Sequence, residues 1–590
     1  MAGRYLVDDE INGLLNEDSE FHRGADNDDE EEGEEEVITR SDHESESEQE
    51  YDSNSNEDNE QSSSTQLINC FIGRDKKCRW NKTCSSASGK TKSRNIVNNY
   101  PGPKSFSEGV TSEVDAFTKM ISLEMIDEIV GYTNIYMQNE RISAKYSRER
   151  DARETTRSEM MALMGLLYLI GVKKANHTDV TELWAVDGSG IEITRAVMGF
   201  KRFLFLLRCI HFDDKRTRQE RRVSDKLAAI RTILDQFVAN CKNSYNVSDF
   251  VTVDEKLQAF RGRCSFLQYL PNKPTRYGIK IFVLADAITF FTNNVEVYCG
   301  KQPPGPFEAS VSPNDIVERL VSHLEGSNRN VTMDNWYSSY ALAVSLKKKG
   351  LTCIGALKKN KMEIPQEFTP HRGRAVQSSM FGFQKDMTLV SYVPKRNKAV
   401  ILLSTMHDDG TVDEDTGKPH ILLDYNSTKG AVDTIEQMCG RYSVARVTRR
   451  WPLVIFYSLL DIAGINAQII YCANEANQRS NRRIFLKEMS LSLLKPRLIE
   501  RAKIPSLPTH IATFLQKYKE PRIEEVEEAE EPVSRKRGRC VACGRGKNVT
   551  TTIRCDICRH FMCKRHVHIT HICERCQVTN EVSDEKKFTP

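Results

Sequence analysis

Three aspartates and one glutamate stand where strands and a helix can bring carboxylates together. The strand-forming runs FVTV and NVTM lead directly into Asp254 and Asp334, and Asp433 lies in AVDTIEQM with Glu436 one helical turn later. Carboxylates that converge repel one another unless cations lie between them. Mg²⁺ and Mn²⁺ prefer such oxygen ligands, and two of these ions roughly 3.5–4 Å apart can clamp both oxygens of a phosphoryl displacement. The pattern therefore predicts a metal site for phosphoryl transfer; the alternative is that each aspartate merely ends its strand.

The elements that must position these carboxylates follow the order β-β-β-α-β-α-β. The predicted elements are strands at 249–260, 277–287 and 293–300, a helix at 313–325, a strand at 329–334, a helix at 339–350 and a strand at 351–357. This order suits a mixed sheet with helices packed on its faces. In the ribonuclease H-like form of that topology, the first and fourth strands are neighbours at the centre of the sheet. We expect the first strand to end at Asp254 and the fourth at Asp334.

Charge is distributed unevenly over the 590 residues. Residues 1–60 carry 24 acidic and 3 basic side chains, a charge of −21, whereas the remainder carries +23. A segment so acidic and so poor in apolar residues buries too little surface to offset its chain entropy, so we expect it to be disordered. An acidic tail on a basic body indicates a protein that binds polyanions, although a solvated surface with a solubilising tail explains the same charges.

Seven of the 17 cysteines are crowded into residues 540–576, and their spacing is that of metal ligands. The other ten are scattered singly, as reduced core thiols are. Four pairs with gaps of two residues predict two tetrahedral zinc sites, with disulfides as the alternative. The pairs are Cys540/Cys543, Cys555/Cys558, Cys563/His566 and Cys573/Cys576. We expect an interleaved cross-brace in which pairs one and three share one ion and pairs two and four the other, with zinc supplying the folding free energy.

Basic side chains lie near the predicted carboxylate site in two stretches of the sequence. The first stretch contains Arg261, Arg263, Lys273, Arg276 and Lys280, and the second contains Arg441, Arg446, Arg449 and Arg450, followed by Trp451. Arginine forks match the geometry of phosphate oxygens, and an aromatic ring can stack on an unpaired base. We predict that these residues contact DNA. The alternatives are that the arginines are solvated surface groups and that the tryptophan belongs to the core.

Five blocks of the sequence together resemble the consecutive signature blocks of piggyBac-type transposases. They are VTVDEKLQAFRGRC, YLPNKPTRYGIKI, NVTMDNWYSSYALA, YNSTKGAVDTIEQM and RRWPLVIFYSLLDIAGINA. The resemblance runs from about residue 110 to the C-terminus and implies a DNA transposase whose catalytic triad is Asp254, Asp334 and Asp433. Some members have a second aspartate three residues after the third triad position. This chain has Glu436 there, so direct ligation and a water-mediated role both stay open.

The resemblance also implies a reaction course. Metal-activated water frees a 3′-OH at each transposon end, that hydroxyl attacks the opposite strand to leave a hairpin, and the reopened ends join staggered positions of a TTAA target. The implied cofactors are Mg²⁺ or Mn²⁺ in the catalytic site and two Zn²⁺ in the C-terminal module, which would bind the terminal inverted repeats. The implied partner is double-stranded DNA, and joining two ends requires a homodimer or a larger assembly.

We predict a multidomain α+β protein with a ribonuclease H-like core. Its predicted segments are an acidic tail (1–66), a basic arm (67–112), a helical dimerisation and DNA-binding domain (113–248 with 443–520), the catalytic core (249–357 with 426–442), an insertion domain (358–425), a charged linker (521–538) and a zinc-binding domain (539–577). SRKRGR at 534–539 resembles a signal for the nuclear import machinery, so we expect a nuclear protein. The longest apolar run, at 160–172, is too short to span a bilayer, so we expect no membrane partner.

Two other functions fit the same sequence. One is a domesticated piggyBac-derived protein that binds DNA in the nucleus without cleaving it, because an intact triad does not by itself exclude lost activity. The other makes the zinc module a protein-interaction or ubiquitin-ligase domain with the body as its scaffold, because cross-braced modules include RING-type ligases and histone-tail readers.

Overall fold

The computed structural model describes most of the chain as two compact units, residues 1–519 and 520–590. The described residues are 39–40, 49–50, 69–84, 93–97, 99–143, 152–271, 273, 275–474, 480–519, 537–543, 547, 549–555 and 557–567. Most of the predicted acidic tail and of the charged linker, together with Cys573 and Cys576, lies outside them.

A mixed sheet organises unit 1. Its central strands, in sheet order, are β10 (Thr292–Val297), β9 (Tyr277–Asp286), β7 (Phe250–Ala259), β11 (Asn330–Met333) and β12 (Thr352–Ala356). β7 is antiparallel to β9 and parallel to β11, and β11 is parallel to β12. With α10 (Pro313–Val321) before β11 and α11 (Tyr340–Lys348) after it, this arrangement confirms the predicted ribonuclease H-like order.

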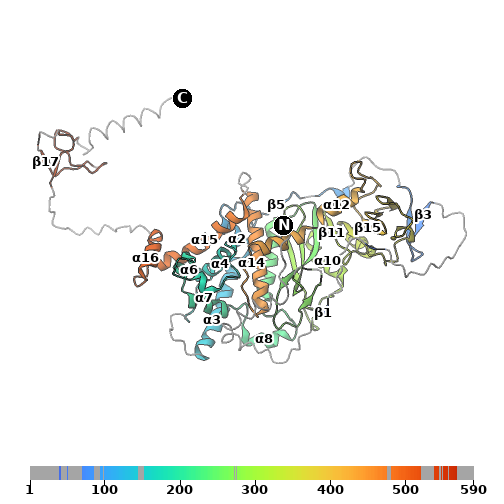
Figure 1. The fold of residues 1–590 in the computed structure, drawn as a ribbon, viewed down its shortest axis with the longest axis horizontal. Coiled ribbons are helices and arrows are strands. Elements are labelled where there is room, and N and C mark those ends of the chain that lie inside the picture. The colour runs from blue at the N-terminus through green and yellow to red at the C-terminus, as the bar shows by residue number, and fades with distance from the viewer. Residues whose placement is uncertain are drawn as a thin grey trace. The chain divides into compact units, whose positions relative to one another are not determined.

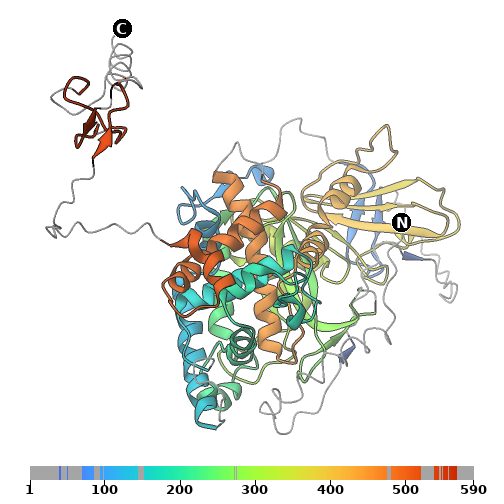
Figure 2. The ribbon, with the colours of Figure 1, turned by 60° about the vertical axis from the view of Figure 1, so that its left-hand side comes forward.

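The sheet continues beyond β12 through strands from the segment that we interpreted as an insertion. Next in order are β15 (Lys398–Ser404), β14 (Met387–Tyr392), β13 (Ser379–Gln384), β4 (Arg79–Asn81) and β3 (Cys70–Ile72). β15 is antiparallel to β12, and Figure 2 shows the yellow strands of this region beside the blue strands from the N-terminal part of the chain. The shorter strands are β1 (Thr39–Arg40), β2 (Gln49–Glu50), β5 (Gly102–Pro103), β6 (Tyr245–Asn246) and β8 (Gln268–Tyr269).

The strand predicted over 249–260 is confirmed, because β7 spans Phe250–Ala259, whereas the expectation that it ends at Asp254 is wrong. Asp254 lies in the middle of β7, which runs on to Ala259. The two charged residues after it are buried and find partners from distant segments: Glu255 accepts a hydrogen bond from Tyr337 Oη (3.0 Å), and Lys256 Nζ donates one to Ser458 Oγ (2.7 Å). Because a buried charge is tolerated when it is hydrogen-bonded, the strand continues through them.

Three helices cover the sheet face on which Asp254 lies: α12 (His420–Thr428), α13 (Ala431–Arg441) and α14 (Trp451–Asn474). Alternate residues of a strand point to the same face. Thr252 donates a hydrogen bond to the carbonyl of Thr428 (2.8 Å), and Lys256 bonds Ser458 of α14. Asp254, between them in the alternation, therefore faces the same helices. The opposite face packs its apolar side chains against α10 and α11.

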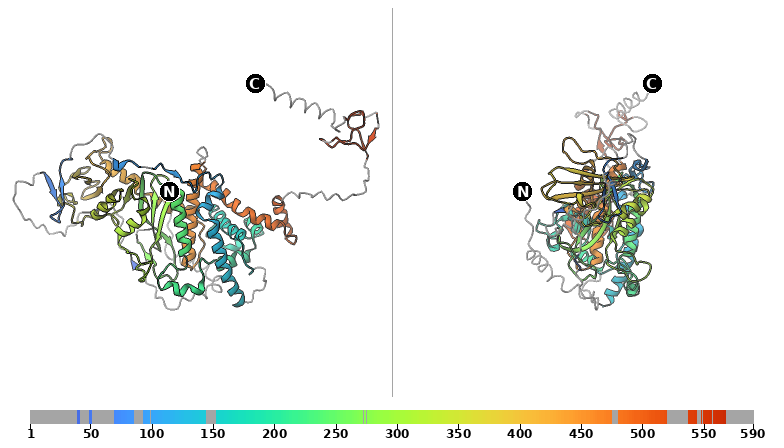
Figure 3. Two further views of the ribbon diagram at one scale, coloured as in Figure 1. Left: turned by 180° about the vertical axis from the view of Figure 1, so that it is seen from behind. Right: turned by 90° about the vertical axis from the view of Figure 1, so that its right-hand side faces the viewer.

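The remaining α-helices of unit 1 form a cluster beside α14. They are α2 (Glu113–Met120), α3 (Leu123–Ser143), α4 (Arg157–Val172), α5 (Val180–Leu183), α6 (Glu192–Val197), α7 (Phe200–Cys209), α8 (Lys215–Arg222), α9 (Arg231–Ser244), α15 (Arg482–Ala502) and α16 (Thr509–Leu515). Of these, α2, α9 and α15 contact α14 directly. Figure 1 shows α14 between the green strands and α3, α4 and α7, and Figure 3 shows the same order from behind. α14 is long and apolar enough to cross a membrane, but 89% of its most apolar window is buried inside the structure.

A buried ion-pair network joins three of these helices. Glu159 of α4 is buried and bonds Arg202 of α7 (2.6 Å) and Arg497 of α15 (2.9 Å). Removing one partner from such a network leaves uncompensated buried charge, which costs about 3–5 kcal/mol. The network therefore ties residues near 160 to residues near 500. In unit 2, β16 (Gly538–Arg539) pairs with β17 (Thr550–Thr551) in antiparallel fashion.

Candidate functional site

Asp254 and Asp334 lie side by side on adjacent parallel strands. Met333 is paired with Val253, so the next residue on each strand is an aspartate. Thr332, two residues before Asp334, contacts the side chain of Thr428 (2.8 Å) on the helix-covered face. The alternation of side chains puts both aspartates on that face. β11 ends at Met333, so the predicted end of the fourth strand at Asp334 is confirmed.

Backbone amides orient both carboxylates. The Glu255 N–H donates to Asp254 Oδ1 (2.8 Å), and the Trp336 N–H donates to Asp334 Oδ1 (2.9 Å). Removal from water and the nearby carboxylates of Glu255, Asp334 and Asp433 raise the pKa of Asp254 well above its usual range. Asp334 and Asp433 thus both lie near enough to Asp254 for their charges to act on it.

Helix α13 brings Asp433 and Glu436 to the same place. Both lie on the helix side that meets the loop between β8 and β9, where Lys273 Nζ is 3.0 Å from Asp433 Oδ1 and 3.0 Å from Glu436 Oε2. Glu436 Oε1 accepts a hydrogen bond from the Leu257 N–H of β7 (3.1 Å). Asp433 is the most open of these groups, with 66% of its side chain exposed. We call Asp254, Asp334, Asp433 and Glu436 the carboxylate cluster.

The chemistry of the carboxylate cluster fits a hard divalent cation. All of its donors are carboxylate oxygens, the ligands of Mg²⁺ and Mn²⁺, and their mutual repulsion is relieved by positive charge. In the part of the chain that the structure describes, the only group of three or more His, Cys, Asp or Glu residues with ligand atoms all within 4.8 Å of one another is in unit 2. No three members of the carboxylate cluster therefore have oxygen atoms all within 4.8 Å of one another, and the ammonium of Lys273 contacts both Asp433 and Glu436.

Sequence reasoning missed Glu255 as a member of this region. Its side chain points to the sheet face opposite Asp254, where Tyr337 donates to it, while its carbonyl oxygen accepts a hydrogen bond from Lys273 Nζ (3.1 Å). The signal available in the sequence was the unbroken charged run Asp-Glu-Lys inside an apolar strand. On this face, opposite Asp254, Lys280 Nζ lies 4.5 Å from the centroid of the Trp336 ring.

Four of the residues predicted to contact DNA have structural roles in this fold. Arg446 donates to the carbonyls of Asn176 (2.7 Å) and Thr178 (2.9 Å). Arg450 donates in the same way to carbonyls at the end of α7, as cationic side chains near helix C-termini do. These forks satisfy backbone groups that would otherwise lack partners.

The other two of these residues, Trp451 and Lys280, are buried. Trp451 packs edge-on against Phe266 with ring centroids 5.2 Å apart, and only 9% of it is exposed. The core alternative is therefore the correct one for this residue. Lys280 is 2% exposed, and burial lowers its pKa. A side chain so enclosed does not reach a DNA backbone.

The remaining arginines are exposed. They are Arg261, Arg263, Arg276, Arg441 and Arg449. The absence of a side chain at Gly262 lets this segment approach the Arg449 segment closely. A Cβ at Gly262 would lie only 2.9 Å from the carbonyl oxygen of Arg449. Arg261 and Arg263 thus flank a close backbone contact with the Arg449 segment. The fold gathers basic groups from two distant stretches into one surface.

Unit 2 contains a four-ligand cluster that fits zinc. Cys540, Cys543, Cys563 and His566 have ligand atoms all within 4.8 Å of one another, with Cys543 Sγ to Cys563 Sγ at 3.7 Å and Cys563 Sγ to His566 Nδ1 at 3.3 Å. Three thiols and one imidazole at such spacing match a tetrahedral zinc site. The cluster joins pairs one and three, as the predicted cross-brace requires. For the second predicted site the structure describes Cys555 and Cys558 but not the other pair.

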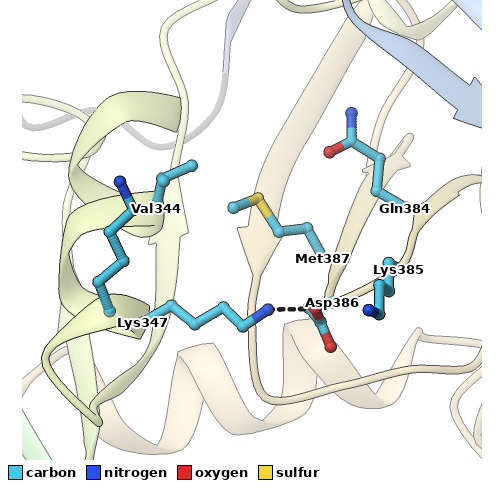
Figure 4. Close-up of a pocket in the computed structure, with 7 residues that line it drawn as sticks. Val344, Lys347, Gln384, Lys385, Asp386 and Met387 are labelled. Atoms are coloured by element: carbon cyan, nitrogen blue, oxygen red, sulfur yellow. Dashed lines mark ion pairs between the residues drawn. The ribbon is translucent and has the colours of Figure 1, made fainter.

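A pocket lies between the end of α11 and the turn from β13 to β14. Its lining includes Lys347, Lys348, Lys385 and Asp386, and Figure 4 shows the Lys347 ammonium reaching across it to Asp386. It shares no residue with the carboxylate cluster.

The chain is similar in sequence and in structure to transposases and to piggyBac-derived proteins. The family model described as Transposase IS4 matches residues 112–468. The human protein named PiggyBac transposable element-derived protein 3 is 19% identical over 378 residues, and the chain spans 61% of its length. The human Chimeric ERCC6-PGBD3 protein is also 19% identical, over 34% of its length. A chain in the cryo-EM structure of a piggyBac transposase synaptic complex with hairpin DNA is 34% identical, with a TM-score of 0.68; the match covers 81% of this chain and all of that one.

Proposed function

The chain belongs to the piggyBac family of transposases, and from that premise we propose that it is a cut-and-paste DNA transposase working by metal-dependent phosphoryl transfer. One observation carries the proposal. The parallel pairing of β7 with β11 sets Asp254 beside Asp334 on the face that α13 covers with Asp433. This arrangement, which brings three carboxylates widely separated in the sequence near one another, supports the proposal.

We assign the divalent cation to Asp254, Asp334 and Asp433. When bound, Mg²⁺ or Mn²⁺ would activate the attacking hydroxyl and stabilise charge on the phosphoryl oxygens. The protein itself keeps the ligating carboxylates in fixed positions. The amides of Glu255 and Trp336 orient two of the carboxylates, and the stiff central strands limit their movement. Such preorganisation is what positions a nucleophile in line with its target.

Glu436 takes a positioning role in this proposal. Both of its oxygens are already engaged, one by the Leu257 amide and one by Lys273. These bonds fasten α13 to β7 and to the loop between β8 and β9, and so fix the helix that carries Asp433. This favours the supporting role over direct ligation, the two alternatives that the sequence left open.

Each step of the proposed reaction is the same displacement at phosphorus with a different nucleophile. Water frees the 3′-OH at a transposon end, the 3′-OH forms a hairpin on the opposite strand, and water reopens it before the end joins a TTAA target. One carboxylate cluster can serve all of these steps because only the incoming oxygen changes. We place the DNA backbone against the exposed surface formed by Arg261, Arg263 and Arg449, since arginine forks suit phosphates.

We further propose that unit 2 binds two zinc ions and recognises the terminal inverted repeats. The cluster of Cys540, Cys543, Cys563 and His566 supports the first ion, and the spacing of the remaining pairs supports the second. Zinc content of the purified chain tests the number of ions directly. We also propose a nuclear protein that acts as a homodimer or larger assembly, because two ends must be joined; imaging in cells and mass measurement of the DNA complex test these points.

The decisive experiment incubates the full chain with end-labelled DNA that carries the terminal sequences of its own element. Mg²⁺ is compared with EDTA, and a duplex with scrambled ends is the control. We expect metal-dependent nicks followed by hairpins at the authentic ends alone. Binding without cleavage at any concentration of Mg²⁺ or Mn²⁺ would favour the domesticated alternative. Ubiquitin transfer without DNA affinity would favour the ligase alternative.

A further inference from the structure

Lys273 is held by three oxygens in and beside the carboxylate cluster. Its ammonium donates to Asp433 Oδ1 (3.0 Å), to Glu436 Oε2 (3.0 Å) and to the carbonyl oxygen of Glu255 (3.1 Å). The side chain is 15% exposed. An ammonium has three donors and no acceptor, so these contacts use its whole hydrogen-bonding capacity. In this state Lys273 has no donor left for the DNA phosphate that the sequence suggested.

The position of this ammonium is that of a counter-ion. Asp254 and Asp334 follow paired residues of adjacent strands, and the Glu436–Leu257 hydrogen bond docks the helix that carries Asp433 against the first of these strands. Such a group of carboxylates is unfavourable without positive charge. Lys273 supplies one cation and occupies Oδ1 of Asp433, one of the two oxygens through which this residue can bind a metal ion. It also ties the β8–β9 loop to α13 through Glu436. A metal ion and this ammonium therefore compete for Asp433.

We propose that Lys273 is the resident counter-ion of the carboxylate cluster and that a divalent cation displaces it on binding. The inference rests on the proposed function, because it takes the carboxylate cluster to be the metal site. Before metal arrives, Lys273 keeps α13 docked on β7 and holds the carboxylates together. Metal binding breaks its ion pair with Asp433, so the measured metal affinity includes the free energy of that displacement.

The chain offers a matched control. Lys349 bridges two carboxylates in the same manner, with Nζ 3.0 Å from Glu318 and 3.1 Å from Glu325. It lies at the end of α11 and contacts no member of the carboxylate cluster. Lys349→Met therefore removes a bridging ammonium without touching the proposed metal site.

The experiment measures Mn²⁺ binding to the zinc-loaded full chain without DNA, by calorimetric titration and by electron paramagnetic resonance of free Mn²⁺. The proteins are wild type, Lys273→Met, Lys273→Gln, Lys273→Arg, Lys349→Met and Asp433→Asn. Ion pairs that are partly exposed contribute modestly, so we expect Lys273→Met to tighten Mn²⁺ binding about two- to fivefold. Lys273→Gln should do the same, whereas Lys273→Arg and Lys349→Met should match wild type. Asp433→Asn should lose the site.

Thermal unfolding supplies a second readout. In EDTA, Lys273→Met should melt below wild type, because the carboxylates then repel one another without compensation, and Mn²⁺ should raise its melting temperature more than that of wild type. Unchanged or weaker Mn²⁺ affinity in both neutral variants, with wild type binding normally, would overturn the inference while leaving the proposed function intact. Absence of Mn²⁺ binding in every protein would instead refute the metal site itself. If Lys273→Met does not fold, Lys273→Gln decides.

Discussion

Gly355 offers a way to disturb the catalytic geometry from the neighbouring strand. It lies in β12 directly beside Met333 of β11. A Cβ at this position would overlap Ser338 Oγ and lie 2.9 Å from Ser338 Cβ. Ser338 is buried, and its hydroxyl donates to the carbonyl of Asp334 (2.7 Å). The substitution Gly355→Ala therefore acts on the turn that holds Asp334 without touching any carboxylate.

The expected cost has two parts. Overpacking a tight site destabilises by about 1–3 kcal/mol, and displacing the Ser338 hydroxyl forfeits a hydrogen bond of about 0.5–1.5 kcal/mol. Gly355→Ala should therefore destabilise unit 1 by roughly 2–4 kcal/mol. Because a shift near 1 Å in a positioned group can cost about a hundredfold in rate, metal-dependent cleavage should fall by about that factor.

The assay compares cleavage rates and melting temperatures of wild type, Gly355→Ala, Gly440→Ala and the double variant Gly355→Ala/Ser338→Ala. Gly440 is the control: it lies in α13 with open space around its Cβ position, so alanine should stabilise the helix by roughly 0.5–1 kcal/mol. Removing the Ser338 hydroxyl should relieve the overlap and restore part of the activity, so the two substitutions should not be additive. Wild-type cleavage and stability in Gly355→Ala would refute the reasoning.

Three further predictions follow from the site, the zinc cluster and the core. Replacing any one triad aspartate by alanine should lower cleavage by roughly 10³-fold or more while DNA binding persists; retained cleavage in one variant would remove that residue from the triad. Cys563→Ser should lose the zinc that its cluster binds and unfold unit 2, with unit 1 still melting as in wild type, as zinc analysis and calorimetry would show; full zinc content would contradict the assignment. Burial raises the pKa of Asp461 to about 6, so its contribution to stability is complete below about pH 4 and is lost as the pH rises through 6. Asp461→Asn should therefore gain up to about 3 kcal/mol over wild type between pH 4 and pH 8, and parallel pH profiles in chemical denaturation would disprove this.

Local patterns predicted the order of the elements well. Pro313 begins α10, and Gly350, at a φ of +69°, follows the end of α11. These are signals that residues carry by themselves, because proline suits the first helical turn and glycine tolerates positive φ. The same reasoning failed at Asp254. The partners that let β7 continue, Tyr337 and Ser458, are 82 and 202 residues away from the residues they stabilise.

The basic residues also show which properties are visible in the sequence and which depend on the fold. Their charge is visible in the sequence, but their use depends on what the fold brings near them. Arg446 and Arg450 reach carbonyls more than 200 residues away, whereas Arg261 and Arg449 stay at the surface. Lys273 was predicted to meet phosphate and instead meets carboxylates contributed by α13.

What the sequence determined by itself was the chemical inventory: three aspartates and a glutamate placed by strand and helix patterns, eight zinc-type ligands at regular spacing, and an acidic tail on a basic body. These follow from local rules, because periodicity, turn residues and ligand spacing act over a few residues. Only the tertiary structure decided that Asp254 and Asp334 are neighbours in register and that a lysine lies among the carboxylates. Pairing of strands 80 residues apart and docking of α13 depend on the burial of distant side chains together, which no short stretch of sequence encodes.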